Sequence, residues 1–187
     1  MQNNSVQVAV LGKEKINIEN PEHRFAMEEA YILGKELGRE KIVVLTGGLG
    51  GIMESISKGV AESGGVSAGF IPILSAEEEE TRKPNKYSTI KIKTGMDQRL
   101  RIPLLINSSN AIIVISGGMG AWLEASFALA NGIPIITLPK TGGTAARLAL
   151  ETPFKDKVII AKDALDAAAS IIRIFTKEDT DDDIVEK

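Results

Sequence analysis

The chain has 187 residues, of which 43% are hydrophobic and 25% charged, as in one globular domain that can bury a sizeable core. Its formal net charge of −3 gives no general attraction to nucleic acid or acidic membranes, so any affinity for phosphate has to be local. The lack of cysteine excludes disulfides, thiolate metal sites and cysteine nucleophiles, and a single histidine, His23, excludes histidine-rich metal clusters.

The first part of the chain alternates apolar runs with amphipathic segments. Asn20-Pro21 predicts a helix start because proline fits the first helical position, and Gly38 predicts that helix's end. The expected elements are a strand over 6–11, a helix over 20–38, a strand over 42–45, a helix over 52–63 that ends at Gly64-Gly65, and a strand over 66–71.

Residues 75–87 interrupt this alternation. Four consecutive glutamates at 77–80 precede Arg82, Lys83 and Pro84, a composition typical of an exposed loop. Two interpretations stay open: a mobile loop over a ligand crevice, or a solvated connection without a further role.

The alternation then resumes. The expected elements are a half-exposed strand over 88–93, a helix over 96–108, a strand over 111–115, a helix over 121–131, a strand over 135–138, a short helix over 142–150, a strand over 158–161 and a closing helix over 163–175. Residues 178–187, with Asp181-Asp182-Asp183, indicate a frayed acidic tail.

Continuously apolar strands that alternate with helices predict one doubly wound α/β domain. The fold class is Rossmann-like, with a mainly parallel sheet and helices on both faces. We place this domain at residues 1–176 and a flexible acidic tail at 177–187. A charged start with an apolar core, as in a signal peptide, is missing from the first residues, and apolar runs stay shorter than a membrane span. We therefore expect a cytoplasmic protein.

Two glycine clusters each follow an apolar strand and open a helix. They read Thr46-Gly47-Gly48-Leu49-Gly50-Gly51 and Ser116-Gly117-Gly118-Met119-Gly120. Glycine lets the backbone approach an anion, and the amides of a first helical turn point at it. The two hydroxyls, of Thr46 and Ser116, could donate to the same ligand. We therefore predict that both loops line one phosphate-binding crevice, rather than serving only tight turns and close packing.

The clusters also carry a family resemblance. Residues 46–54, followed by Lys58-Gly59-Val60-Ala61, resemble the first signature of a superfamily that contains molybdenum cofactor carrier proteins, Lonely Guy phosphoribohydrolases and, more distantly, DNA-processing protein A. Residues 116–124 resemble its second signature, Pro/Gly-Gly-Gly-x-Gly-Thr-x-x-Glu. Met96-Asp97-Gln98-Arg99 stands where the phosphoribohydrolases carry Met-His-x-Arg, and the short form is most similar to the carriers.

The resemblance implies roles for two charged residues. Arg99 would clamp a phosphate with its planar guanidinium. Glu124, expected in the first turn of its helix, would contact ribose and support N-glycosidic cleavage, although an acid there also suits the helix dipole. Arg99 and Glu124 would be catalytic only in a phosphoribohydrolase. We interpret Arg101 as a structural or surface residue.

Other residues keep two interpretations. Glu54 is a helix-start acid or faces the ligand, and Trp122 packs in a core or dimer contact or stacks on a base or pterin. Gly142-Gly143-Thr144 makes a third phosphate contact or a plain helix start. His23 is expected on a helix surface.

Departures from the signatures weaken the case for an enzyme. Ala121 replaces the expected threonine, Ser116 replaces proline or glycine, Asp97 stands in place of histidine and Leu100 in place of lysine. Superfamily members are often labelled lysine decarboxylase-like, but the sequence lacks the Schiff-base framework of a pyridoxal enzyme.

The expected function is therefore binding of a phosphorylated ligand, either molybdopterin cofactor or an AMP-like nucleotide, with no metal site and no required cofactor. The alternative is a phosphoribohydrolase that cleaves nucleoside 5′-monophosphates to free base and ribose 5-phosphate. We expect a homodimer or larger homo-oligomer that binds neither nucleic acid nor membrane.

Overall fold

The computed structural model describes residues 5–151 and 153–181. The strands are β1 (Gln7–Gly12), β2 (Val43–Thr46), β3 (Ser67–Ile71), β4 (Ile90–Lys93), β5 (Ala111–Ile115), β6 (Ile135–Leu138) and β7 (Val158–Ile160). The helices are α1 (Pro21–Arg39), α2 (Ile52–Glu62), α3 (Ala76–Thr81), α4 (Arg101–Asn107), α5 (Met119–Ala130), α6 (Gly143–Leu150) and α7 (Ala164–Asp181), with a 3₁₀ turn η1 (Pro139–Thr141).

The strands form one seven-stranded sheet in the order β4-β3-β2-β1-β5-β6-β7, and every pair of neighbours is parallel. The chain winds outward from β1 in one direction through β4 and, after crossing back, in the other direction from β5. The strand order thus reverses between β1 and β5, where Gly12 pairs with Ile115. In sheets of this kind ligands bind at the carboxyl ends of the strands beside such a reversal.

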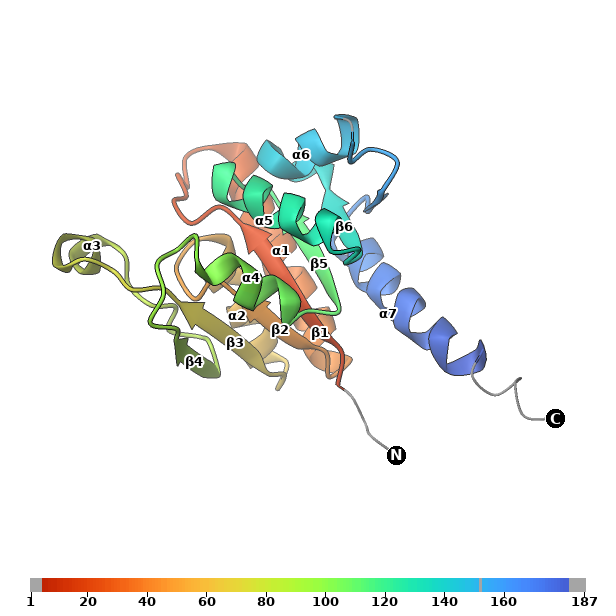
Figure 1. The fold of residues 1–187 in the computed structure, drawn as a ribbon, viewed down its shortest axis with the longest axis horizontal. Helices are drawn as coiled ribbons and strands as arrows, with labels where there is room; N and C mark the ends of the chain where they lie inside the picture. Colours follow the sequence, from red (N-terminus) through yellow and green to blue (C-terminus); the bar gives the residue numbers. More distant parts are fainter. Residues whose placement is uncertain (1–4, 152, 182–187) are drawn as a thin grey trace.

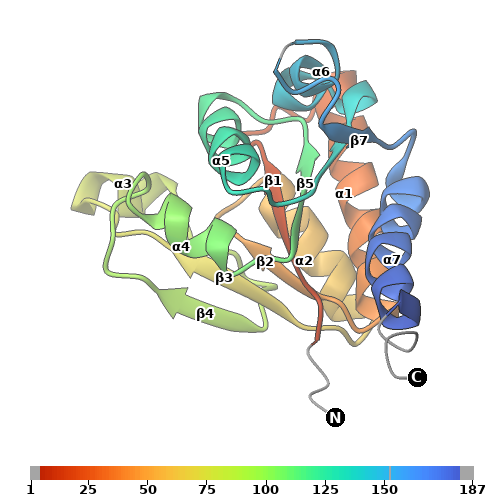
Figure 2. The same ribbon diagram turned by 45° about the vertical axis from the view of Figure 1, so that its right-hand side comes forward.

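Helices cover both faces of the sheet (Figures 1 and 2). On one face α1, α2 and α7 bury a cluster that includes Val8, Val10 and Ile113. On the other face α4, α5 and α6 bury a second cluster, with Ala9, Leu11 and Ile112 facing it from the same strands. Alternate residues of one strand therefore feed opposite cores, which confirms the predicted doubly wound fold.

The segment between β3 and β4 differs from the prediction. Residues 75–87, expected as a loop, contain the helix α3, which stands away from the rest of the domain (Figure 1). A capping box fixes its start, because the Ser75 side chain accepts from the Glu78 amide and the Glu78 carboxylate accepts from the Ser75 amide. The acidic run therefore suits the first turn of a helix as well as it suits a loop.

Three helix boundaries also differ. The helix α4 begins at Arg101 instead of residue 96, because Asp97 accepts hydrogen bonds from the amides of Arg99 and Leu100 and holds a turn there. The helix α5 begins at Met119, so Glu124 lies in its second turn and not in the first. The helix α7 continues to Asp181, past our expected domain end at residue 176, and residues 182–187 of the expected acidic tail lie outside the described residues.

Candidate functional site

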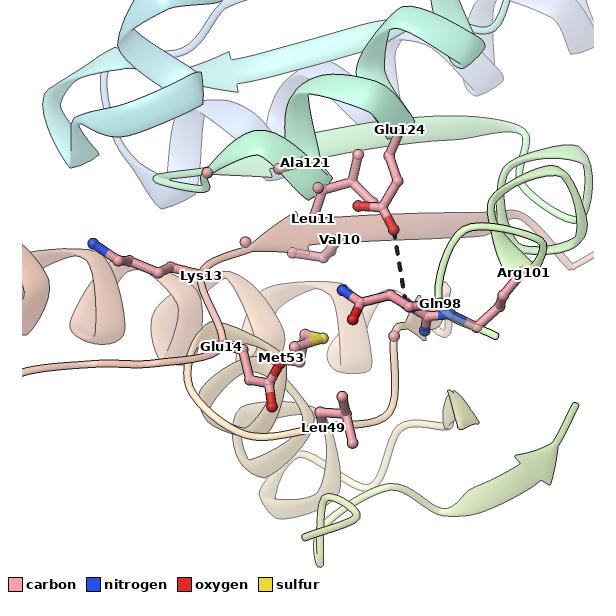
Figure 3. A pocket seen from close by; sticks show the side chains of 14 residues that line it. Val10, Leu11, Lys13, Glu14, Leu49, Met53, Gln98, Arg101, Ala121 and Glu124 are labelled. Atoms are coloured by element: carbon pink, nitrogen blue, oxygen red, sulfur yellow. Dashed lines mark ion pairs between the residues drawn. The ribbon is translucent and has the colours of Figure 1, made fainter. Parts of the chain in front are cut away.

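A pocket of about 190 Å³ lies at the carboxyl edge of the sheet, beside the strand reversal (Figure 3). It is called the main pocket below because both glycine loops border it. Four separate segments supply its walls: the end of β1 with the loop after it, the first glycine loop with α2, the turn before α4, and the second glycine loop with α5. The lining residues are Val10, Leu11, Gly12, Lys13, Glu14, Gly47, Leu49, Met53, Gln98, Arg101, Gly118, Gly120, Ala121 and Glu124.

Both glycine loops thus border one pocket, as the sequence predicts. Gly47 and Leu49 come from the first loop, and Gly118 and Gly120 come from the second. A second pocket of about 270 Å³ adjoins it through the shared residues Gln98, Gly120 and Glu124, and its other lining residues are Arg99, Ile102, Met119 and Leu123.

The charged pair in this pocket is Arg101 and Glu124. Arg101 Nη2 lies 3.9 Å from Glu124 Oε1, and the two side chains are only 4% and 13% exposed (Figure 3). Arg101 Nη1 donates to the carbonyl of Phe70 at 2.6 Å, which aims the guanidinium across the end of the sheet. Of the two expectations for Arg101, structural or surface, the surface one is therefore wrong.

This ion pair is incomplete. A separation of 3.9 Å is too long for a hydrogen bond, so the two charges attract without direct contact. Arg101 Nε is also buried, and it has no hydrogen-bond partner among residues 5–151 and 153–181. Burial raises the pKa of Glu124 to about 7, against the opposing effect of Arg101, which favours the carboxylate. Glu124 can consequently exchange a proton near neutral pH.

The second glycine loop opens toward this pair. The first intrahelical bond of α5 runs from the Trp122 amide to Gly118, so the amides of Met119, Gly120 and Ala121 lie in the first turn. A Cβ added at Gly118 would meet nothing within 4 Å, and one at Gly120 would come no closer than 3.9 Å to Gln98. The start of α5 therefore has room for an anion beside the pocket.

The first glycine loop is filled by protein groups. The Ile52 amide at the start of α2 donates to the carbonyl of Lys13, and a Cβ at Gly51 would lie 2.3 Å from the carbonyls of both Lys13 and Glu14. At Gly47 a Cβ would lie 2.7 Å from Arg101 Nη1. Glycines here make room for the β1–α1 loop and for Arg101, so they do not form an open amide cradle.

The candidate third contact, Gly142-Gly143-Thr144, proves to be the packed start of α6. The amides of Thr144 and Ala145 donate to the carbonyls of Gly117 and Ser116. The carboxylate of Glu22 lies against Gly142, where a Cβ would approach it to 2.1 Å. The α6 amides thus hold the second glycine loop in place.

Several predicted ligand contacts lie outside the main pocket. Arg99 is exposed and borders only the adjoining pocket, as does Met119. Thr46 is fully buried and its hydroxyl accepts from the Gly48 amide, whereas the Ser116 amide donates to Thr141. Gly48, Gly50, Gly51 and Gly117 also stay outside the lining. Ligand contacts by these residues stay predictions.

The structure places two residues with open interpretations, Trp122 and Glu54, and also His23. Trp122 packs edge-on against Phe154 with ring centroids 4.9 Å apart, and Arg147 lies 4.1 Å from its ring centroid, so it takes the packing role. Glu54 lines a separate surface pocket beside Tyr31. His23 Nδ1 accepts from the Asn17 amide, and its Nε2 lies 2.9 Å from Lys13 Nζ.

Sequence reasoning missed the pocket residues Lys13, Glu14 and Gln98. The first two directly follow β1, and polar residues at the end of a central strand are a usable signal for a site at a strand reversal. Among the described residues, histidine, aspartate and glutamate form no group of three that could hold a metal ion. Within that part of the chain, none of the helices combines the length and apolar character that a membrane crossing needs.

Comparisons with solved structures agree with the fold. A molybdenum cofactor binding protein from Rippkaea orientalis superposes with a TM-score of 0.76 at 25% identity, covering 92% of this chain and 98% of that one. The Moco carrier protein of Chlamydomonas reinhardtii gives 0.73 at 25% identity, with 92% and 98% covered. DNA processing protein A from Helicobacter pylori shares the fold alone, at 16% identity, a TM-score of 0.65, and 90% and 80% covered.

The comparison with family models confirms the predicted resemblance. An uncharacterized protein from Archaeoglobus fulgidus is 29% identical over 124 residues, which are 66% of this chain and 78% of the relative. The model of the SLOG cluster4 family matches residues 5–170, which include both glycine loops and every residue of the pocket. The chain therefore belongs to the SLOG cluster4 family.

Proposed function

We propose that this protein binds a phosphorylated ligand of the molybdopterin or AMP type in the pocket between the two glycine loops. The observation that carries the proposal is the incomplete pairing of Arg101, a buried cation beside the open start of α5. A buried charge is costly unless charged or hydrogen-bonding partners surround it. A ligand phosphate there would complete the guanidinium's hydrogen bonds and accept from the first-turn amides of α5.

The size of the site supports a phosphate with an attached ring system. The main pocket of about 190 Å³ suits a phosphate and part of a sugar. Pockets that hold a whole ligand usually have volumes of about 300–1,000 Å³. The adjoining pocket of about 270 Å³ has the apolar side chains of Ile102, Met119 and Leu123, which suit a flat base or pterin. Two solved proteins of similar fold are described as a molybdenum cofactor binding protein and a Moco carrier, which supports the same ligand class.

Calorimetric titration with AMP and with molybdopterin tests the proposal. We expect saturable binding of at least one of them, and about 100-fold weaker binding by Arg101→Gln, because a charge-assisted bidentate contact is lost. Arg99→Gln is the competing variant rather than a neutral control: Arg99 borders the adjoining pocket but is exposed and lies outside the main pocket, so its loss should change the affinity less than about threefold. Thermal unfolding of each variant confirms that it is folded during the titration.

Two outcomes would contradict this assignment. One is the absence of binding of either probe by the wild-type protein. The other is a larger loss in Arg99→Gln than in folded Arg101→Gln, which would move the phosphate to the exposed side of the adjoining pocket.

One observation favours a second candidate, hydrolysis of nucleoside 5′-monophosphates. A carboxyl group with a pKa of about 7 is suited to proton transfer at neutral pH. In such a reaction water would add to the ribose C1′ as the N-glycosidic bond breaks, and the base would leave with that bond's electron pair and a proton. Glu124 would move the proton and Arg101 would hold the phosphate.

The two candidate functions are distinguished by incubating the protein with AMP and measuring free adenine by chromatography. Turnover by the wild type that is lost in Glu124→Gln supports the hydrolase, whereas saturable binding without free adenine supports the carrier. Homo-oligomerisation and a cytoplasmic location stay predictions.

A further inference from the structure

Residues 72–89, between β3 and β4, are here called the β3–β4 arm. Its helix α3 buries little apolar surface against the domain. Glu78 is half-buried and the other five residues of α3 are exposed. The helix α3 must therefore be held against the domain mainly by polar contacts.

The base of the arm is fixed to the first glycine loop. Asn85 is only 1% exposed, its backbone amide donates to the Gly48 carbonyl, and its side-chain amide donates to the Met53 carbonyl, both at 2.9 Å. These contacts hold the chain three residues after Arg82. They leave α3 itself, farther from this anchor, to be held by other groups.

Arg82 supplies those contacts at the end of α3. Its Nε and Nη2 each donate to the Glu14 carboxylate at 2.8 Å, its Nη2 also donates to Gln98 at 3.0 Å, and its Nη1 donates to Glu78 at 2.6 Å. The Arg82 side chain is 13% exposed. Glu14 and Gln98 both line the main pocket (Figure 3). The Arg82 side chain therefore joins the arm to two walls of the pocket.

The same contact sets the charge of the pocket. The Glu14 carboxylate faces a pocket that also holds Glu124, and the bidentate guanidinium of Arg82 offsets its negative charge. Without Arg82, the Glu14 carboxylate would lose its hydrogen-bonded cation, leave only the more distant charge of Arg101 to offset it, and make the wall of a site for an anion more negative. A negative charge in the wall of a partly desolvated pocket measurably weakens the binding of an anionic ligand.

We propose that Arg82 is a positioning residue that holds the β3–β4 arm against the ligand pocket and neutralises Glu14, so that the pocket accepts an anionic ligand. The part that concerns the ligand rests on the proposed function. The part that concerns the arm does not, and it is tested separately.

A Glu-specific protease tests the attachment of the arm without any ligand, because its cleavage sites at residues 77–80 are the same in every variant. Arg82→Gln should be cut there about ten times faster than the wild type, since cleavage requires local opening of α3, which Arg82 ties to the domain at its end. Lys83→Gln is the matched control: it removes a neighbouring positive charge whose ammonium donates to the Glu79 carbonyl within the arm. Equal cleavage rates in the two variants, with sites identified by mass spectrometry, would overturn the proposed attachment.

AMP titration tests the effect of charge. We expect Arg82→Gln to bind AMP about tenfold more weakly, Lys83→Gln to bind like the wild type, and the double variant Arg82→Gln/Glu14→Gln to recover to within about threefold of the wild type. A purely structural role for Arg82 would leave the double variant as weak as the single one, and that result overturns the neutralisation. If the wild type binds no probe, the proposed function fails and neutralisation for a ligand fails with it, while the cleavage rates still decide whether Arg82 holds the arm.

Discussion

The two glycine loops look alike in sequence and differ in what surrounds them. Each follows a buried strand and begins a helix, yet the carbonyls of Lys13 and Glu14 crowd the start of α2 while the start of α5 opens on a pocket. The difference comes from the neighbours, because the loop after β1 folds over the first cluster. Glycine therefore serves close backbone packing in one loop and leaves space for a ligand in the other.

The largest effect that follows from this comparison is on stability in the filled loop. Gly51 has φ +66° and its added Cβ would lie 2.3 Å from two carbonyls, so Gly51→Ala should lower the free energy of unfolding by about 3 kcal/mol. Gly50→Ala, one residue earlier, is the matched control, since its Cβ would meet nothing closer than 3.9 Å and the expected loss is below about 1 kcal/mol. Urea unfolding measures both. Losses below about 1 kcal/mol in both variants would mean that the first loop is as open as the second.

The next effect concerns the acid on the helix of the open loop. The pKa of Glu124 is about 7 in the folded protein and near 4.5 when unfolded, so the folded state binds the proton more tightly. The free energy of unfolding should therefore fall as pH rises from about 4.5 to about 7, by an amount on the order of 2 kcal/mol. Glu124→Gln has no such proton and should flatten that dependence. Urea unfolding at pH 5 and pH 7.5 checks it, and equal slopes in the two proteins would show that the Glu124 carboxyl is well solvated.

The smallest effect is expected at the open loop itself. Gly118 has φ −123°, which alanine adopts without strain, and its Cβ would enter open space, so Gly118→Ala should change the free energy of unfolding by less than about 1 kcal/mol. The same methyl group would stand where a phosphate approaches the α5 amides, and we expect about tenfold weaker AMP binding in calorimetric titration. Unchanged affinity would place the phosphate away from the start of α5.

The sequence by itself determined the architecture of this protein. Apolar runs such as residues 111–115 and helix-start signals such as Asn20-Pro21 report local periodicity and capping, which depend on near neighbours in the chain. The parallel direction of the strands followed from the regular alternation with helices, whereas their order in the sheet came from the structure. The edge on which both glycine loops lie followed from the same alternation.

Only the tertiary structure decided which groups meet at that edge. Arg99 and Arg101 are two residues apart, and an Asx turn at Asp97 shifts the start of α4 so that Arg101 enters the pocket while Arg99 faces solvent. Arg82 meets Glu14 across 68 positions, a pairing that no local pattern encodes. Such contacts depend on how loops fold over one another, and burial then sets both the charge of the pocket and the pKa of Glu124.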